Sequence, residues 1–276
     1  MFEKNAELQQ ALRKKSDIRL RLGVAAFLRI QQQAKMQPIQ GLDVLERLDP
    51  DESFIIATTH ATGFDIPLSI NAVSKHLDIA IADQSTHSRL ENEPIAYISP
   101  KLTGSANYLP VSYSWHGKTQ KRADAFNPTD SQPIERGLRL GKSILIAAHN
   151  PIMLDQEGAP MPPRPGYMAA YTAATTGARI LPLGVSYVPT DKPRVYETTV
   201  SIGEPFQFNA TTDVARIHGL SEKRQEEPLS RGEARALTAE FKNLRNDGGA
   251  VLRSVQALQT LEGGYSIIDN AYASRA

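Results

Sequence analysis

The sequence predicts an α/β fold in which a mixed, mostly parallel sheet is flanked by helices. Short apolar runs rich in β-branched residues recur along the chain, segments with helical spacing separate them, and turn-forming residues stand at their boundaries. Strands that alternate with helices are typical of βαβ units, in which the strands run parallel. With 276 residues, 41% of them hydrophobic, the chain is long enough to bury one large core.

The core of the fold is expected between residues 51 and 210. Its clearest strand is the apolar run that ends just before His60, and each later strand follows a helical segment. Residues 158–165 hold four prolines and are expected to be irregular. The expected strands are 54–59, 78–82, 107–111, 143–148, 180–188 and 197–202, and the expected helices are 64–77, 133–140 and 166–176.

Helical segments are expected on both sides of this core. Residues 1–50 form an N-terminal helical segment, in which 6–37 is a basic amphipathic helix. Its apolar stripe either packs on the core or lies on an anionic membrane surface, and the sequence leaves both readings open. Residues 211–276 form a helical extension of the same domain, with one helix over 232–246, a break at Gly248-Gly249 and a second helix over 250–261.

Composition and missing motifs exclude several classes of function. A formal net charge of +1 argues against nucleic acid as a partner, and the absence of cysteine excludes thiolate chemistry and Cys-based metal sites. We find no signal peptide, no apolar stretch long enough to span a bilayer, no nucleophile elbow, no Walker A loop and no dinucleotide fingerprint. The predicted location is the cytoplasm, with peripheral membrane contact if the N-terminal helix binds a surface.

His60 and Asp65 are the candidate catalytic pair. His60 comes at the carboxyl end of a predicted buried strand, where open α/β sheets usually bind their ligands. Gly63 allows a tight turn that brings the Asp65 carboxylate to one imidazole nitrogen, while Thr59 and Thr62 leave room for a substrate. This arrangement predicts a general base, in which the carboxylate fixes the tautomer of the imidazole. A structural hydrogen bond between the two side chains is the alternative.

The segment TTHATGFD at Thr58–Asp65 resembles the His-x4-Asp motif of the glycerolipid acyltransferase superfamily, which includes lysophospholipid and glycerol-3-phosphate acyltransferases. Further segments resemble that family in the same order along the chain, and the resemblance covers about Phe54 to Phe206. These segments are NYLPV at Asn107–Val111, ILIAAHNP at Ile144–Pro151, RPGYMAAY at Arg164–Tyr171, ARILPLGV at Ala178–Val185 and IGEPF at Ile202–Phe206.

The resemblance implies an enzyme that moves a fatty acyl group from acyl-CoA or acyl carrier protein to an acceptor hydroxyl. His60 would be the general base and Asp65 would orient it. The thioester is a co-substrate, so no bound cofactor is implied. The implied partners are the acyl donor and a lipid or other hydroxylated acceptor, and a membrane surface is a further partner if the N-terminal helix binds one.

The chain departs from the family at the acceptor site. The family's third motif, a Glu-Gly-Thr-Arg segment that helps to hold a glycerol phosphate, is replaced here by HNPI from His149 to Ile152. The usual arginine of the family's second motif is not evident near Tyr108–Ser112. Either the acceptor lacks that phosphate, or other basic residues bind it, since arginine forks recognise phosphate most specifically. The candidates for phosphate binding are Lys118, Lys121, Arg122 and Arg164.

His149 also ends a predicted strand, so it is expected in the same cleft as His60, where Asn150 would hydrogen-bond the acceptor. A hydrogen bond from His149 to loose backbone groups is the alternative reading. No second carboxylate or close histidine pair gives metal-ligand spacing, so no metal site is predicted. The altered third motif keeps a second function open, that of a catalytically weak or inactive lipid-binding relative.

Overall fold

The computed structural model describes residues 34–49, 51–58, 65–84, 108–111, 131–150, 164–165, 167–192 and 195–259. Its helices are α2 (Leu42–Glu46), α3 (Asp65–Val73), α5 (Gln132–Arg139), α6 (Tyr167–Thr176), α7 (Val214–Glu226) and α8 (Arg231–Gln256). Its strands are β1 (Ala34–Met36), β2 (Phe54–Thr58), β3 (Ile79–Gln84), β4 (Tyr108–Val111), β5 (Ser143–Ala147), β6 (His149–Asn150), β7 (Arg164–Pro165), β8 (Arg179–Pro189) and β9 (Tyr196–Ile202).

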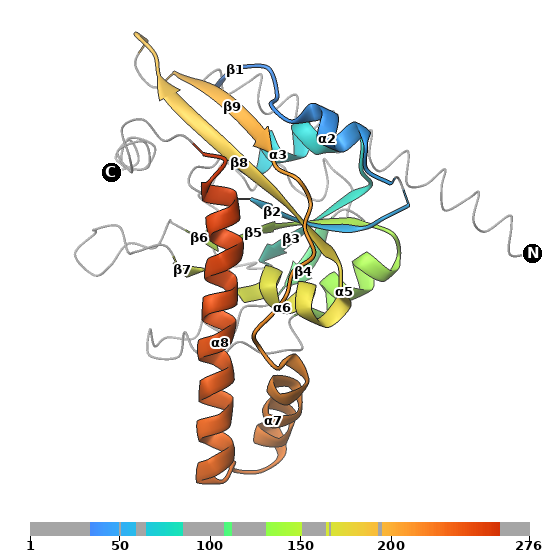
Figure 1. Cartoon of the computed structure of the whole chain (residues 1–276), viewed down its shortest axis with the longest axis vertical. Helices are drawn as coiled ribbons and strands as arrows, with labels where there is room; N and C mark the ends of the chain where they lie inside the picture. The colour runs from blue at the N-terminus through green and yellow to red at the C-terminus, as the bar shows by residue number, and fades with distance from the viewer. Residues whose placement is uncertain are drawn as a thin grey trace, which may run out of the picture.

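The main sheet has seven strands in the order β1-β9-β8-β2-β5-β3-β4. From β8 to β4, each neighbouring pair is parallel. The β8–β9 pair is antiparallel, and β1 runs parallel to β9 at the edge. The prediction of a mixed, mostly parallel sheet flanked by helices is therefore confirmed (Figure 1).

Alternate residues of β2 face two hydrophobic clusters on opposite sides of the sheet. Phe54 and Ile56 pack with residues of α2 and α3, whereas Ile55 and Ala57 pack with residues of α5, α6 and α8. All five residues of β2 are buried, which explains why its sequence is a continuous apolar run rather than an alternating one. The helices on either side hold β2 in the middle of the molecule.

Two expectations for the ends of the core are wrong. Residues 34–36 were expected in a helix, but they form strand β1, because the open edge of β9 supplies backbone partners such as Thr198, which pairs with Met36. Arg164 and Pro165 were expected to be irregular, but they pair with β6. A proline is tolerated there because the ladder has two strands, and each of them is an edge. The rest of the N-terminal helix prediction lies outside the described residues.

Helix α8 is continuous over 26 residues, so the predicted break at Gly248-Gly249 is wrong. The neighbouring Asp247 is buried, and its carboxylate accepts hydrogen bonds from the backbone N–H groups of Thr211 and Thr212 and from both hydroxyls. These bonds and the packing of α8 on α6 and β8 outweigh the helix propensity cost of glycine, about 1 kcal/mol each. Tertiary contacts therefore keep α8 helical at Gly248 and Gly249, where its helix propensity is lowest.

We expect Asp247→Ala to lower the free energy of unfolding by about 2–3 kcal/mol, because buried donors of the 211–212 segment lose a charged acceptor. For a chain of this size the melting temperature should fall by about 5–10 °C. Thermal denaturation followed by circular dichroism measures the shift. Asn246→Ala, an exposed neighbour in the same helix, is the control and should change stability by less than about 0.5 kcal/mol. Equal melting of the two variants would contradict this role of Asp247.

Helix α7, which the sequence analysis did not predict, lies beside the N-terminal half of α8 (Figure 1). Asp213 caps it by accepting the N–H of Arg216 at 3.0 Å. Lys223 Nζ donates to Glu233 at 2.6 Å, and this bond is the largest reason why the pKa of Glu233 falls to about 2. Because the folded-state pKa is depressed, this tie between the helices is complete above about pH 4.5 and is lost as the pH falls toward 2.

The end of α8 is held against β8. A Cβ atom placed on Gly184 would lie 2.7 Å from Leu258, so only glycine lets the two backbones come this close. Gln259 Nε2 donates to the carbonyl oxygen of Val185 at 3.0 Å. The chain at the end of α8 is therefore packed directly against β8.

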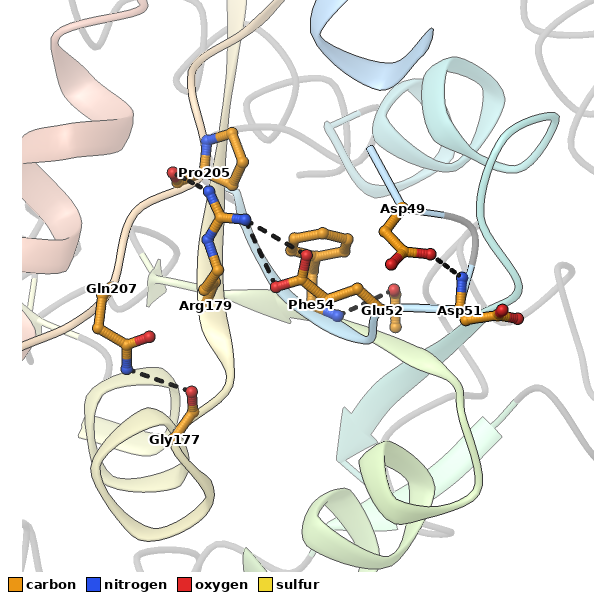
Figure 2. A network of polar contacts seen from close by, with 9 residues as sticks. Asp49, Asp51, Glu52, Phe54, Gly177, Arg179, Pro205 and Gln207 are labelled. Atoms are coloured by element: carbon orange, nitrogen blue, oxygen red, sulfur yellow. Dashed lines mark hydrogen bonds and ion pairs between the residues drawn. The ribbon is translucent and has the colours of Figure 1, made fainter. Parts of the chain in front are cut away.

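A polar network closes the amino-terminal edge of the sheet (Figure 2). Arg179 donates to Glu52 at 3.3 Å and to the carbonyl oxygen of Pro205 at 2.8 Å, and its guanidinium lies 5.9 Å from the centre of the Phe54 ring. Phe54 and Arg179 are also register partners at the start of β2 and β8. The network thus aligns the strands at the edge opposite to their carboxyl ends.

Candidate active site

The carboxyl ends of β2 and β5 lie side by side. Thr58 pairs with Ala147, and the N–H of Ala148 donates to the carbonyl oxygen of Thr58 at 2.6 Å. His60 follows Thr58 by two residues, and His149 follows Ala147 by two residues. Both histidines therefore come directly after strands that end at the same edge of the sheet.

The end of β2 is also joined to α3. The side chain of Thr58 is fully buried, and its hydroxyl lies 2.9 Å from the hydroxyl of Ser69 on α3. Residues 59–64 connect the two elements and lie outside the described part of the chain. The hydroxyl pair fixes the distance between the strand end and the helix that follows the candidate histidine.

Asp65 is the first residue of α3 and is fully buried. A carboxylate at a helix N-terminus is stabilised by the helix dipole, but its burial still requires hydrogen-bond partners. Tyr187 of β8 supplies one, because its hydroxyl donates to Oδ1 of Asp65. A carboxylate has about four lone-pair sites, so this bond is compatible with a second bond from an imidazole N–H.

Sequence reasoning missed Tyr187. It alternates with Leu183 and Val185 along β8, which places it in the hydrophobic cluster on the α3 side of the sheet. Its ring meets Tyr196 of β9 edge to face, with centroids 6.3 Å apart and planes at 87°. A buried tyrosine near a strand end needs a partner for its hydroxyl, and this was the signal that could have identified it.

For three residues that were predicted to contact the substrate, the structure describes the position of the backbone. His149 and Asn150 form β6, which pairs with Arg164 and Pro165 of β7, so that Asn150 lies opposite Arg164. The two-stranded ladder follows β5 directly and brings the altered third motif next to the arginine that was expected to bind an acceptor. The predicted residues that fall outside the described ranges are His60, Thr59, Thr62, Gly63, Lys118, Lys121 and Arg122.

Among the residues that the structure describes, no three His, Asp or Glu side chains gather into a metal-binding group. Within the same ranges no helix is both long and apolar enough to cross a membrane. The described part of the candidate site centres on the buried Asp65 carboxylate, which Tyr187 holds by a hydrogen bond.

No protein-family model matches the sequence, and no curated protein matches it. Among solved structures, the chain is similar to the 1-acyl-sn-glycerophosphate (LPA) acyltransferase PlsC from Thermotoga maritima. The match has a TM-score of 0.44 and 15% sequence identity, and it covers 80% of this chain and 85% of that one.

Proposed function

We propose that the protein is an acyltransferase that moves a fatty acyl group from a thioester, either acyl-CoA or acyl carrier protein, to an acceptor hydroxyl. The observation that carries the proposal is the setting of Asp65: it is fully buried, it begins the helix after the candidate histidine, and Tyr187 fixes one of its oxygens. A buried, hydrogen-bonded carboxylate five residues after a histidine that follows a strand supports a His–Asp general base. The resemblance of Thr58–Asp65 to a His-x4-Asp motif supports the same reading.

In the proposed mechanism His60 takes the proton of the acceptor hydroxyl while the hydroxyl oxygen attacks the thioester carbonyl carbon. A new C–O bond forms, and the tetrahedral intermediate then collapses with cleavage of the C–S bond. The imidazolium returns its proton to the leaving thiolate, so that the products are an ester and a free thiol. Asp65 keeps the imidazole in the tautomer that accepts a proton on the substrate side, and it stabilises the imidazolium.

Product analysis by mass spectrometry tests the proposal. The purified chain is incubated with acyl-CoA or acyl carrier protein and a panel of hydroxylated lipid and non-lipid acceptors. We expect an acyl ester of at least one acceptor, with release of the free thiol. Acyl-thioester binding without an ester product on any acceptor would instead support an inactive lipid-binding protein.

Tyr187 is expected to position Asp65 for this reaction. We expect Tyr187→Phe to lower kcat about tenfold and to leave the KM for the acyl donor almost unchanged, because a hydrogen bond to a charged group is lost away from the donor. Steady-state kinetics on the acceptor found in the panel give both constants. Tyr196→Phe is the matched control, since it removes a hydroxyl from the ring that packs against Tyr187. Equal effects of the two changes, or a change in KM alone, would contradict the assignment.

The acceptor is predicted to lack a phosphate beside the reacting hydroxyl. His149 and Ile152 stand where the family carries a carboxylate and a guanidinium, so a phosphorylated acceptor loses a charge-assisted bidentate contact. We expect lysophosphatidate and glycerol 3-phosphate to be used about ten- to hundredfold less well than a neutral, amino- or sugar-bearing acceptor. His149→Ala should weaken use of that acceptor.

Competition between matched phosphorylated and unphosphorylated acceptors measures this preference. A strong preference for the phosphorylated member would show that the basic candidates bind the phosphate. Single substitutions of Lys118, Lys121, Arg122 and Arg164 would then identify the residue responsible.

A further inference from the structure

Helix α8 carries all its acidic residues on one side. Glu233, Glu240 and Asp247 recur every seven residues and point toward the protein. Glu233 accepts from Lys223, Glu240 accepts from the N–H of Asp213, and Asp247 accepts from the 211–212 segment. The acidic side of the helix is therefore used to hold α7 and the chain that leads into it.

The opposite side of α8 is basic, and we define the basic stripe as Arg231, Arg235, Lys242, Arg245 and Arg253. At 3.6 residues per turn, the steps of four, seven, three and eight residues place all five within about 40° of one line along the helix. All five are exposed, and within the described ranges none of them forms an ion pair. Their charges are not neutralised by α7 or by the sheet.

The stripe is long and straight. From Arg231 to Arg253 it extends about 33 Å, at a rise of about 1.5 Å per residue. Ala234 and Ala239, which flank the stripe on the exposed surface of α8, have small side chains that would not hold the helix away from a flat partner. Figure 1 shows α8 along the long axis of the molecule with one side away from the sheet.

We propose that the basic stripe binds an anionic membrane surface through lipid headgroups. A straight row of cations can meet a flat surface along its whole length, and each cation near an anionic surface is attracted to the headgroups. The chain as a whole carries a formal charge of only +1, so the attraction is local and orients the molecule with α8 against the surface.

The stripe is an electrostatic contact without an apolar anchor. The exposed large hydrophobic residues of the described chain are Met36, Leu42 and Leu140, and none of them lies on α8. Binding is therefore expected to be reversible and to weaken as salt screens the headgroup charge. The stripe consists of other residues than the N-terminal helix predicted from the sequence, and the inference does not depend on acyl transfer.

Vesicle sedimentation with the full chain tests the proposal. The vesicles contain either phosphatidylcholine alone or equal parts of phosphatidylcholine and phosphatidylglycerol. The test variant carries Arg235→Gln, Lys242→Gln and Arg245→Gln, since glutamine keeps the helix propensity of the residues it replaces. The matched control carries Lys75→Gln, Arg136→Gln and Lys192→Gln, which remove the same charge from exposed positions on other elements.

We expect the wild-type chain and the control to bind the anionic vesicles and not the neutral ones, with binding that falls as salt is added. The test variant should lose on the order of a hundredfold in partition coefficient, because each cation near an anionic surface contributes about a factor of five. Circular dichroism establishes that both variants are folded.

Several results would overturn the proposal: no preference of the wild-type chain for anionic vesicles, full binding by the test variant, or equal losses in the two variants. If the test variant kept vesicle binding but lost turnover only with an acyl carrier protein donor, the stripe would be a protein-docking surface instead. Because vesicle binding needs no turnover, failure of the proposed acyl transfer would leave this experiment unaffected.

Discussion

A folded His60→Ala variant is expected to lose acyl transfer by a factor of about 10²–10⁴, the usual contribution of a general base. The reason is that the acceptor hydroxyl loses the group that takes its proton as it attacks the thioester. The initial rate of thiol release in the presence of acceptor measures the effect. Donor binding should stay close to that of the wild-type chain, because the base does not hold the thioester.

His76→Ala is the matched control for this experiment. His76 is exposed in the turn after α3, so its removal leaves the candidate site untouched. We expect wild-type turnover from this variant. A folded His60→Ala protein that turns over at the wild-type rate would exclude the proposed mechanism.

Asp65→Asn is expected to lower the rate of the chemical step by a factor of about 10²–10⁴, because the amide keeps the size of the carboxylate but loses its charge and its preference for one imidazole tautomer. Single-turnover measurements with saturating donor separate this step from binding. The amide can still accept the hydrogen bond of Tyr187 through its oxygen, so the fold should persist.

Asp78→Asn provides the comparison for Asp65→Asn. Asp78 accepts from Lys142 at 2.9 Å just before β3, at the amino-terminal edge of the sheet, so the same change there should affect stability and leave the catalytic rate unchanged. If Asp65→Asn weakened donor binding while the rate per bound complex stayed normal, Asp65 would be a binding or structural residue.

The strands were predictable because a strand that is buried on both faces consists mainly of apolar residues. β2, β5 and β8 are covered on both faces, so each reads as a run of apolar residues, and the helices between them show turn residues at both ends. Helix α7 was missed because only Ile217 and Ser221 are buried in it. Its stability comes from packing on α8 and from the Asp213 cap, and neither of these leaves a periodic apolar pattern in the sequence of α7.

The candidate site was predictable only in part, for a related reason. Local sequence identified Asp65, because the histidine and the carboxylate stand five residues apart at the end of one strand. Tyr187 lies 122 residues further along, and nothing in the spacing of β8 indicates which helix its hydroxyl meets. That pairing follows from the strand order, which places β8 next to β2, and it becomes visible only in the folded chain.

The order of strands in the sheet also affects how the chain folds during synthesis. β2 is made early, yet its partner in β8 begins 125 residues later, from Phe54 to Arg179 (179 − 54). At roughly 5–20 residues per second, the ribosome needs about 6–25 s to supply that partner. Throughout this interval β2 lacks its β8 neighbour, which leaves its apolar side chains and one row of its backbone N–H and C=O groups without native partners, so the nascent chain is open to aggregation. We therefore expect the protein to depend on chaperones while it is being made, even if the finished molecule is stable.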